Sequence, residues 1–268
     1  MSEDDFEEYD ELREPTKSDK RIKGIEFRKA WAGVFDYKTL EALEDLRRFK
    51  VLQDIYWVVS TGKEADVFYG KTWDDREVAV KIYRIHTSRF KKIDDYILGD
   101  RRFGKIRSNI KLKWSWARRE FKNLKLAFRA GVSVPEPIKV HRNIVVMQFI
   151  GDEGTPAPLL KDVEEIENPE KLFEEIISDM NKLYNKAKLV HADLSPFNIL
   201  YWKGKHYIID MAQGVRLDQE FALKFLYRDI VNMVSFFQSF LDKEIDPDKI
   251  YREITGKDVD PYIKSSIS

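Results

Sequence analysis

The chain has 268 residues, 43% of them hydrophobic and 13% aromatic, which is enough for one large domain or two small ones with substantial cores. It contains no cysteine, so disulfides and cysteine-ligated metals are excluded, and four scattered histidines do not suggest a zinc site. The acidic first residues and the lack of a long apolar stretch argue against a secretory signal and a membrane span. We therefore expect an intracellular, cytoplasmic protein.

The formal net charge of zero hides two segments of opposite charge. Residues 1–14 carry eight acidic side chains and one basic one, and we interpret residues 1–20 as an acidic disordered tail. Residues 84–129 carry fifteen Lys or Arg and four acidic residues, interleaved with aromatic residues. This pattern is typical of nucleic-acid contact, although solvated helix faces are an alternative. Its first part, 84–113, lacks a clear period and is predicted to be a mobile or functional loop.

Apolar residues at helical spacing in 21–50 predict a helical extension, with one helix starting at Asp36. Residues 51–69 follow as a strand pair around the turn STGKEA, whose backbone and side chains can hold phosphate oxygens. The side chains concerned are Ser60, Thr61 and Lys63. The turn is neither a Walker A motif nor a GxGxxG loop, so a plain hairpin turn is an equal alternative.

The next strand, Glu77–Tyr83, contains the letters VAVK. Its lysine, Lys81, stands where the third strand of kinases carries the lysine that grips nucleotide phosphates. A helix is predicted from about Trp114 to Arg129, with Ala117, Phe121, Leu124 and Phe128 on one face. Glu120 is the single acidic residue of that helix and is therefore the expected partner of Lys81. The alternative is an intrahelical pair of Glu120 with a neighbouring Lys or Arg.

Two further strands end in a Gly- and Pro-rich break, which we interpret as the boundary between two lobes, 51–150 and 151–268. The backbone of Gln148 and Ile150 is expected to hydrogen-bond an adenine edge at this hinge. Met147 would be the apolar neighbour of the base.

The second lobe carries the stretch 189–213, in which apolar strands flank Asp193, Asn198 and Asp210. An Asp followed five residues later by an Asn, then a hairpin that ends in another Asp, is the arrangement of kinase-type phosphotransferases. Asp193 would orient the attacking hydroxyl, and Asn198 and Asp210 would supply oxygen ligands to magnesium. His191 would brace the loop from inside. The alternative is that these residues serve only as turn and capping residues.

A helix is predicted from about Glu220 to Leu241, with Asp229 in an apolar stretch. A carboxylate in such surroundings needs partners. It can hold the backbone of the predicted catalytic loop, the loop that carries Asp193 and Asn198, or it can pair near Arg228 or face solvent. A last helix is predicted over Pro247–Thr255.

With these residues in place, the chain resembles the Rio family of atypical serine protein kinases, and within it the first subfamily. The resemblance covers roughly 27–254 and is carried by STGKEADVF, VAVKIY, LVHADLSPFNIL and IIDMAQGV. It implies an α+β, two-lobed protein-kinase-like fold, with a small β-rich first lobe and a mainly helical second lobe. The family lacks the activation segment and the peptide-docking helices of ordinary protein kinases, which agrees with the 58 residues that follow Asp210.

The resemblance also implies roles for individual residues. Asp193 looks like the catalytic base, Asn198 and Asp210 like metal ligands, and Lys81 like the nucleotide lysine. The family implies ATP and Mg²⁺, which Mn²⁺ can replace, a serine/threonine-protein kinase with ATPase activity, and an aspartyl-phosphate at Asp210. It further implies work on the small ribosomal subunit, with its rRNA as the partner of the basic segment. One departure is the hinge residue Gln148, where an acidic residue is expected.

Two other functions compete with this interpretation. One is a small-molecule phosphotransferase of the aminoglycoside or choline kinase type, which is disfavoured by STGKEADVF and by the short second lobe. The other is a non-catalytic rRNA-binding assembly factor, which is disfavoured because Lys81, Asp193, Asn198 and Asp210 are all present. The protein acceptor and the oligomeric state do not follow from the sequence.

Overall fold

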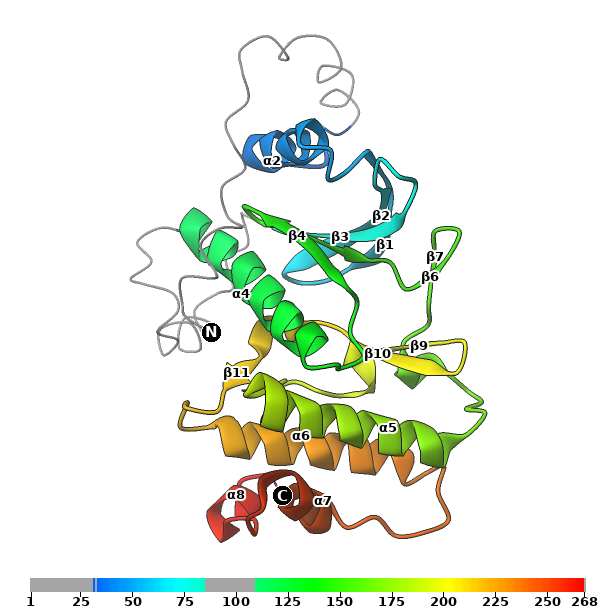
Figure 1. Ribbon diagram of the computed structural model, residues 1–268, viewed down its shortest axis with the longest axis vertical. Coiled ribbons are helices and arrows are strands. Elements are labelled where there is room, and N and C mark those ends of the chain that lie inside the picture. Colours follow the sequence, from blue (N-terminus) through cyan, green and yellow to red (C-terminus); the bar gives the residue numbers. More distant parts are fainter. Residues whose placement is uncertain (1–30, 32, 85–108, 268) are drawn as a thin grey trace. The chain divides into compact units, whose positions relative to one another are not determined.

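The structure is a computed structural model that describes residues 31, 33–84 and 109–267 (Figure 1). This part of the chain divides into two compact units. The first contains the described residues up to 84 together with 109–118 and 138–147, and the second contains 119–137 and 148–267. Within these described ranges, no helix is long and apolar enough to cross a membrane.

The first unit is built on a five-stranded sheet with the order β1-β2-β3-β5-β4. β1 pairs with β2, and β2 with β3, in antiparallel fashion. The strands are β1 Asp54–Thr61, β2 Ala65–Lys71, β3 Glu77–Tyr83, β4 Pro137–His141 and β5 Ile144–Gln148. They confirm the strands predicted before the hinge.

The core of the first unit lies on one face of this sheet. Val78 and Val80 lie on the same face, because alternate residues of a strand point in the same direction. Both are 0% exposed. They pack in one cluster with Leu43 and Leu46 of helix α2, Tyr37–Arg48. Lys81 is a strand neighbour of Val80, so its side chain belongs to the opposite face of the sheet.

The predicted start of the helix after Asp36 is confirmed, whereas the predicted start of the helix near Trp114 is wrong. The start at Asp36 is confirmed, since its carboxylate accepts a hydrogen bond from the N–H of Lys38 at 3.0 Å. Helix α4 begins at Asn109 rather than near Trp114 and ends at Arg129. Phe128 was predicted on one face of α4 with Ala117 and Leu124, and it is 44% exposed whereas they are buried. The face that packs includes polar side chains, which an apolar pattern does not reveal. The helix predicted before Asp36 lies outside the described residues.

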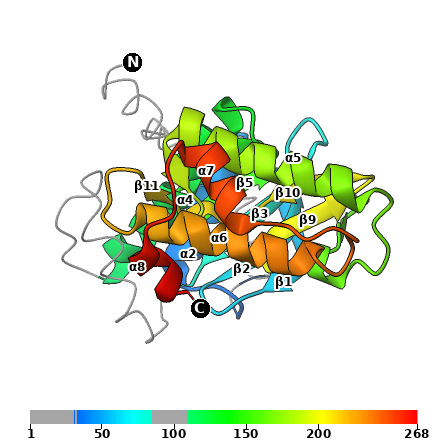
Figure 2. The ribbon, with the colours of Figure 1, turned by 90° about the horizontal axis from the view of Figure 1, so that it is seen from below.

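The second unit is mainly helical. Its helices are the second half of α4, α5 Pro169–Lys182, α6 Ala222–Phe237, α7 Pro247–Thr255 and α8 Pro261–Ser265. Figure 2 shows α5 and α6 side by side, and the rings of Phe173 on α5 and Phe237 on α6 lie 5.2 Å apart between their centres. Asn168 caps α5 ahead of Pro169, and Pro247–Thr255 matches the predicted last helix. α8 was not predicted.

Short strand pairs complete the second unit. They are β6 Gly151–Asp152 with β7 Thr155–Pro156, β8 Leu189–Val190 with β11 Val215–Arg216, and β9 Ile199–Trp202 with β10 Lys205–Ile208. β9 and β10 form the predicted hairpin that ends just before Asp210. The structure thus confirms the strands that flank Asp193, Asn198 and Asp210.

A buried polar cluster around Asp179 joins three parts of the second unit. The carboxylate is 1% exposed and accepts hydrogen bonds from the backbone N–H of Ser133 at 2.7 Å and from Lys182 at 2.6 Å. His206 Nε2 on β10 lies 2.9 Å from the same carboxylate. Burial raises the pKa of Asp179, but the hydrogen bonds from His206, Lys182 and Ser133 outweigh it and lower the pKa to about 2.

Replacement of Asp179 by Asn should therefore destabilise the protein in a pH-dependent manner. Because the folded-state pKa lies below the ordinary 3.8, the ionised carboxylate stabilises the fold above about pH 4, and this contribution disappears as the pH falls towards 2. We expect a loss of about 2 kcal/mol at pH 7. Denaturant unfolding of wild type and Asp179→Asn between pH 7 and 2.5 measures it, with Asp242→Asn at an exposed position as the control. A difference that stays constant over this range would contradict the assignment.

Candidate active site

The predicted catalytic residues Asp193 and Asn198 are in direct contact. The Asn198 amide Nδ2 donates to the backbone carbonyl of Asp193 at 2.8 Å and to its carboxylate at 3.2 Å. Gln213 Nε2 donates to the same carboxylate at 3.3 Å. Asp193 is exposed, whereas its neighbours Ala192 and Leu194 are buried. The loop thus presents one carboxylate to solvent while the backbone on either side is packed inside.

Asp210 is tied to the same loop through the backbone. The N–H of Ile209 donates to the carbonyl of Asn198 at 2.9 Å, so the residue immediately before Asp210 is hydrogen-bonded to Asn198. Asp210 has φ 60° and ψ 59°, in the left-handed region that few residues other than glycine adopt. Only residues 211–221 separate it from the start of α6. The structure therefore brings the three predicted residues into one local assembly.

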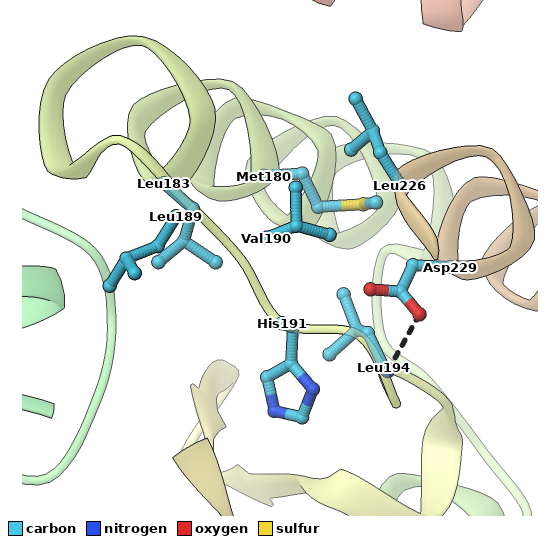
Figure 3. A pocket seen from close by; sticks show the side chains of 8 residues that line it. All are labelled: Met180, Leu183, Leu189, Val190, His191, Leu194, Leu226 and Asp229. Carbon is cyan, nitrogen blue, oxygen red and sulfur yellow. Dashed lines mark hydrogen bonds between the residues drawn. The ribbon is translucent and has the colours of Figure 1, made fainter. Parts of the chain in front are cut away.

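Helix α6 holds the backbone of the catalytic loop. The carboxylate of Asp229 accepts hydrogen bonds from the N–H of Ala192 at 2.8 Å and of Leu194 at 3.0 Å, the latter drawn in Figure 3. Arg228 donates to the carbonyl of Ala192 at 2.5 Å, and Asn232 to that of Leu194 at 3.0 Å. Both peptide groups that flank Asp193 are thereby bonded to one helix. Of the roles considered for Asp229, holding the loop backbone is confirmed.

Asp229 is 1% exposed, and its environment changes its acidity. Burial raises the pKa of Asp229 to about 8, although the hydrogen bonds from Leu194 and Ala192 and the nearby Arg228 guanidinium act in the opposite direction. A buried carboxyl group of this kind is stable only when its oxygens are bonded. The catalytic loop therefore depends on Asp229, and Asp229 depends on the loop.

The inner side of the loop borders a small cavity (Figure 3), lined by apolar side chains together with His191 and Asp229. Its volume of about 10 Å³ leaves room for roughly one water molecule, so it is not a substrate site. His191 is 2% exposed, and its Nε2 lies 3.0 Å from the carbonyl of Ile209. This contact joins the start of the catalytic loop to the residue before Asp210. The predicted bracing role of His191 is confirmed.

Helix α4 supports the loop that follows Asp210, which the sequence did not indicate. Asn123 Nδ2 donates to the carbonyls of Met211 at 2.9 Å and Gly214 at 3.0 Å, and Arg119 donates to Gly214 at 3.0 Å. A β-carbon on Gly214 would lie 2.9 Å from Asn123 Nδ2, so this position favours glycine. Arg119 and Asn123 are spaced i and i+4, but other polar residues of this basic helix hide that signal.

The predicted phosphate turn lies between β1 and β2 in the first unit. Ser60 and Thr61 end β1, Lys63 follows, and all three are exposed. The N–H of Gly62 donates to the carbonyl of Ala65 at 2.9 Å, so the turn is a closed hairpin. The structure places these side chains together at one end of the sheet, and their role in binding phosphate stays a prediction.

Arg84, the residue after β3, fastens this hairpin to the sheet. Its guanidinium makes two hydrogen bonds to the carboxylate of Asp66, at 2.7 and 2.6 Å, and its N–H donates to the carbonyl of Glu64 at 2.9 Å. A paired contact of this kind fixes both distance and direction. The turn is therefore positioned relative to β3, the strand that carries Lys81.

Lys81 is half-buried on β3, opposite Val67 of β2, and its Nζ lies 5.4 Å from the centre of the Tyr83 ring. Glu120, its predicted partner, is 2% exposed and belongs to the second unit. Because the two residues lie in different units, their pairing stays a prediction.

The hinge prediction concerns particular backbone atoms. The N–H of Gln148 donates to the carbonyl of Glu136 at 2.9 Å, and the carbonyl of Ile150 accepts from Ala157 at 2.9 Å. The bonds to an adenine edge would therefore involve the carbonyl of Gln148 and the N–H of Ile150. This contact also stays a prediction.

The chain is similar to known proteins over most of its length. The family model described as RIO domain matches residues 66–250. The chain is 38% identical to the RIO-type serine/threonine-protein kinase Rio1 of Haloferax volcanii, over 93% of this chain and 83% of that protein. It is 36% identical to the protein of the same name from Methanocaldococcus jannaschii, over 97% of this chain and 90% of that protein.

A solved structure shows the same fold. The Rio2 kinase–ADP/Mg²⁺–phosphoaspartate complex from Chaetomium thermophilum matches with a TM-score of 0.62 at 21% identity, over 85% of this chain and 73% of that chain. This chain has an antiparallel sheet followed by a mainly helical region, which confirms the predicted kinase-like fold. The chain therefore belongs to the RIO family of serine/threonine-protein kinases, and within it to the Rio1 type.

Proposed function

We propose that this kinase transfers the γ-phosphoryl group of ATP in a Mg²⁺-dependent reaction centred on Asp193, Asn198 and Asp210. The observation that supports this most strongly is the hydrogen bonding among these residues. The Asn198 side chain contacts the Asp193 carboxylate, and the Asn198 carbonyl accepts from Ile209, the residue before Asp210. Helix α6 fixes the backbone on both sides of Asp193. Such positioning before the substrate arrives is the main way in which a protein accelerates phosphoryl transfer.

The donor set suits magnesium. The Asn198 amide uses its nitrogen to bind Asp193, which directs its oxygen Oδ1 elsewhere, and Asp210 offers a carboxylate. Mg²⁺ is commonly held by one or two such oxygens together with water and substrate phosphates, rather than by a cage of protein ligands. Among the described residues, no group of three or more His, Cys, Asp or Glu forms such a cage. When bound, the ion neutralises charge on the phosphate oxygens.

Asp193 would act on the acceptor hydroxyl of a serine or threonine. Its carboxylate would take the hydroxyl proton while the new oxygen–phosphorus bond forms and the bond to the β–γ bridging oxygen breaks, so that ADP leaves with that electron pair. Exposure of Asp193 leaves it accessible to an acceptor. Its bonds to Asn198 and Gln213 hold the carboxylate in one orientation.

We also propose an aspartyl-phosphate at Asp210. A carboxylate oxygen would attack the γ-phosphorus, ADP would leave, and water would later release phosphate and a proton while regenerating the carboxylate. The phosphoaspartate in the Chaetomium Rio2 complex belongs to that protein and motivates the extension to this chain. The unusual backbone conformation of Asp210 is the kind of feature that gathers at functional sites.

The remaining predicted residues would bind ATP. Lys81, paired with Glu120, would hold phosphate oxygens together with the Ser60–Lys63 turn, and the hinge atoms of Gln148 and Ile150 would hold the adenine. In this proposal Mn²⁺ can replace Mg²⁺.

The partner we propose is the maturing small ribosomal subunit, with its rRNA bound by the basic segment 84–129 in the cytoplasm. The excess of positive charge in this segment supports the idea. Anisotropy titration with a short labelled rRNA fragment should show affinity that falls steeply as salt increases, because bound cations are released from the phosphates. Binding that is insensitive to salt, or unchanged when Lys91, Lys92, Arg101 and Arg102 are replaced by Gln, would contradict this partner.

The chemistry is tested with γ-labelled ATP and Mg²⁺. Acid-stable label, hydroxylamine-labile label and free phosphate are measured for wild type, Asp193→Ala, Asp210→Ala and the exposed control Asp242→Ala. We expect both active-site variants to lose phosphotransfer by at least a hundredfold, because each removes a group with a direct role, as seen when single catalytic groups are deleted. The control should match wild type.

The three products distinguish the competing functions. Hydroxylamine-labile label that Asp210→Ala abolishes supports the acyl-phosphate. ATP binding without any turnover would contradict the catalytic proposal and favour a non-catalytic assembly factor. Efficient transfer to aminoglycosides or choline, with none to protein, would favour the small-molecule phosphotransferase.

A further inference from the structure

Phe197 is an exposed aromatic residue next to the candidate catalytic group. It lies in the short turn Pro196–Asn198 and is 63% exposed, whereas Phe173 and Phe237 between α5 and α6 are buried. A single exposed apolar side chain needs no explanation by itself. Its place, immediately before Asn198 in the loop that presents Asp193, is what gives it significance.

The backbone on both sides of Phe197 is held in place. The N–H of Asn198 donates to the carbonyl of Ser195 at 2.9 Å, and the Asn198 side chain is bonded to Asp193. Pro196 restricts the residue before it. Lys161 Nζ lies 5.2 Å from the centre of the Phe197 ring, a distance at which a cation is attracted to an aromatic face. The ring is therefore an ordered surface beside the candidate active site.

Because Phe197 lies close to Asp193 along the loop, only the part of an acceptor peptide near its reacting hydroxyl can contact the ring. The Asn198 amide is 3.2 Å from the Asp193 carboxylate, and Phe197 is the adjacent residue. An extended peptide advances about 3.3 Å per residue and alternates the direction of its side chains. When its hydroxyl reaches Asp193, a side chain a few residues away can reach Phe197.

We infer that Phe197 recognises the protein acceptor by contacting an apolar or aromatic side chain within three residues of the phosphorylated serine or threonine. This inference rests on the proposed role of Asp193. Charge supports an apolar partner, because Lys161, the cation beside the ring, already forms an ion pair with its neighbour Asp162. A phosphate or acidic side chain is not favoured there.

The test uses synthetic dodecapeptides. The parent has one serine in an alanine background with terminal lysines, and each derivative has phenylalanine at one of the three positions on either side of the serine. The ratio of kcat/KM for derivative and parent is measured with wild type, Phe197→Ala, Phe197→Leu and Phe221→Ala. Phe221 is the matched control, since it is 57% exposed at the start of α6.

We expect wild type to prefer phenylalanine at one or two positions by about tenfold, which corresponds to about 1.4 kcal/mol, slightly less than full burial of an aromatic side chain provides. Phe197→Ala should reduce this ratio to about one, mainly through a higher KM, because the contact is equal in the ground and transition states. Phe197→Leu should retain part of the preference. The Phe221→Ala ratio should equal that of wild type.

Two results would overturn the inference while leaving the proposed function intact. One is a preference that persists in Phe197→Ala. The other is a wild-type enzyme that hydrolyses ATP but treats all the peptides alike or phosphorylates none. If wild type does not turn over ATP with Mg²⁺ at all, the proposed function fails and the inference fails with it. Thermal unfolding of each variant shows whether a lost preference reflects a lost fold.

Discussion

The candidate active site depends on one buried carboxylate. Asp229 is 1% exposed and accepts hydrogen bonds from the N–H groups on either side of Asp193, at Ala192 and Leu194. Leaving a buried polar group without a partner costs about 1–3 kcal/mol, so the carboxylate and the two amides constrain each other. With the bonds from Arg228 and Asn232 to the two carbonyls, the loop backbone has little freedom while the Asp193 side chain stays open to solvent.

The loop after Asp210 is built on the same plan, with α4 in the place of α6. Asn123 and Arg119 bind backbone carbonyls of residues 211–214, and glycine at 214 lets the helix approach. His191 connects the two loops through the carbonyl of Ile209. The groups proposed to carry the chemistry thus extend from backbone that two helices hold through side-chain hydrogen bonds. Preorganisation of this kind explains how short loops can carry a catalytic site.

Much of this could be predicted from the sequence because the signals are local. The spacing of Asp193, Asn198 and Asp210 between apolar strands predicted their grouping. The apolar surroundings of Asp229 indicated that it needs partners, and holding the loop backbone was one of the roles considered. Arg119 and Asn123 were missed, since polar residues on a helix look like solvent-facing ones unless their distant partners are known. The apolar pattern also did not show that Phe128, near the end of α4, is exposed. Pairings between the two units, such as Lys81 with Glu120, stay predictions.

The central claim is that α6 holds the catalytic loop rigidly through Asp229. The most direct test is native-state hydrogen exchange of the backbone amides of Ala192 and Leu194, measured by NMR on the full chain. The account predicts that both amides exchange as slowly as those in the middle of α6, such as Ile230 and Met233, because they are released only when that helix opens. Exchange as fast as that of exposed loop amides would show that the loop moves independently of α6, and would contradict the account.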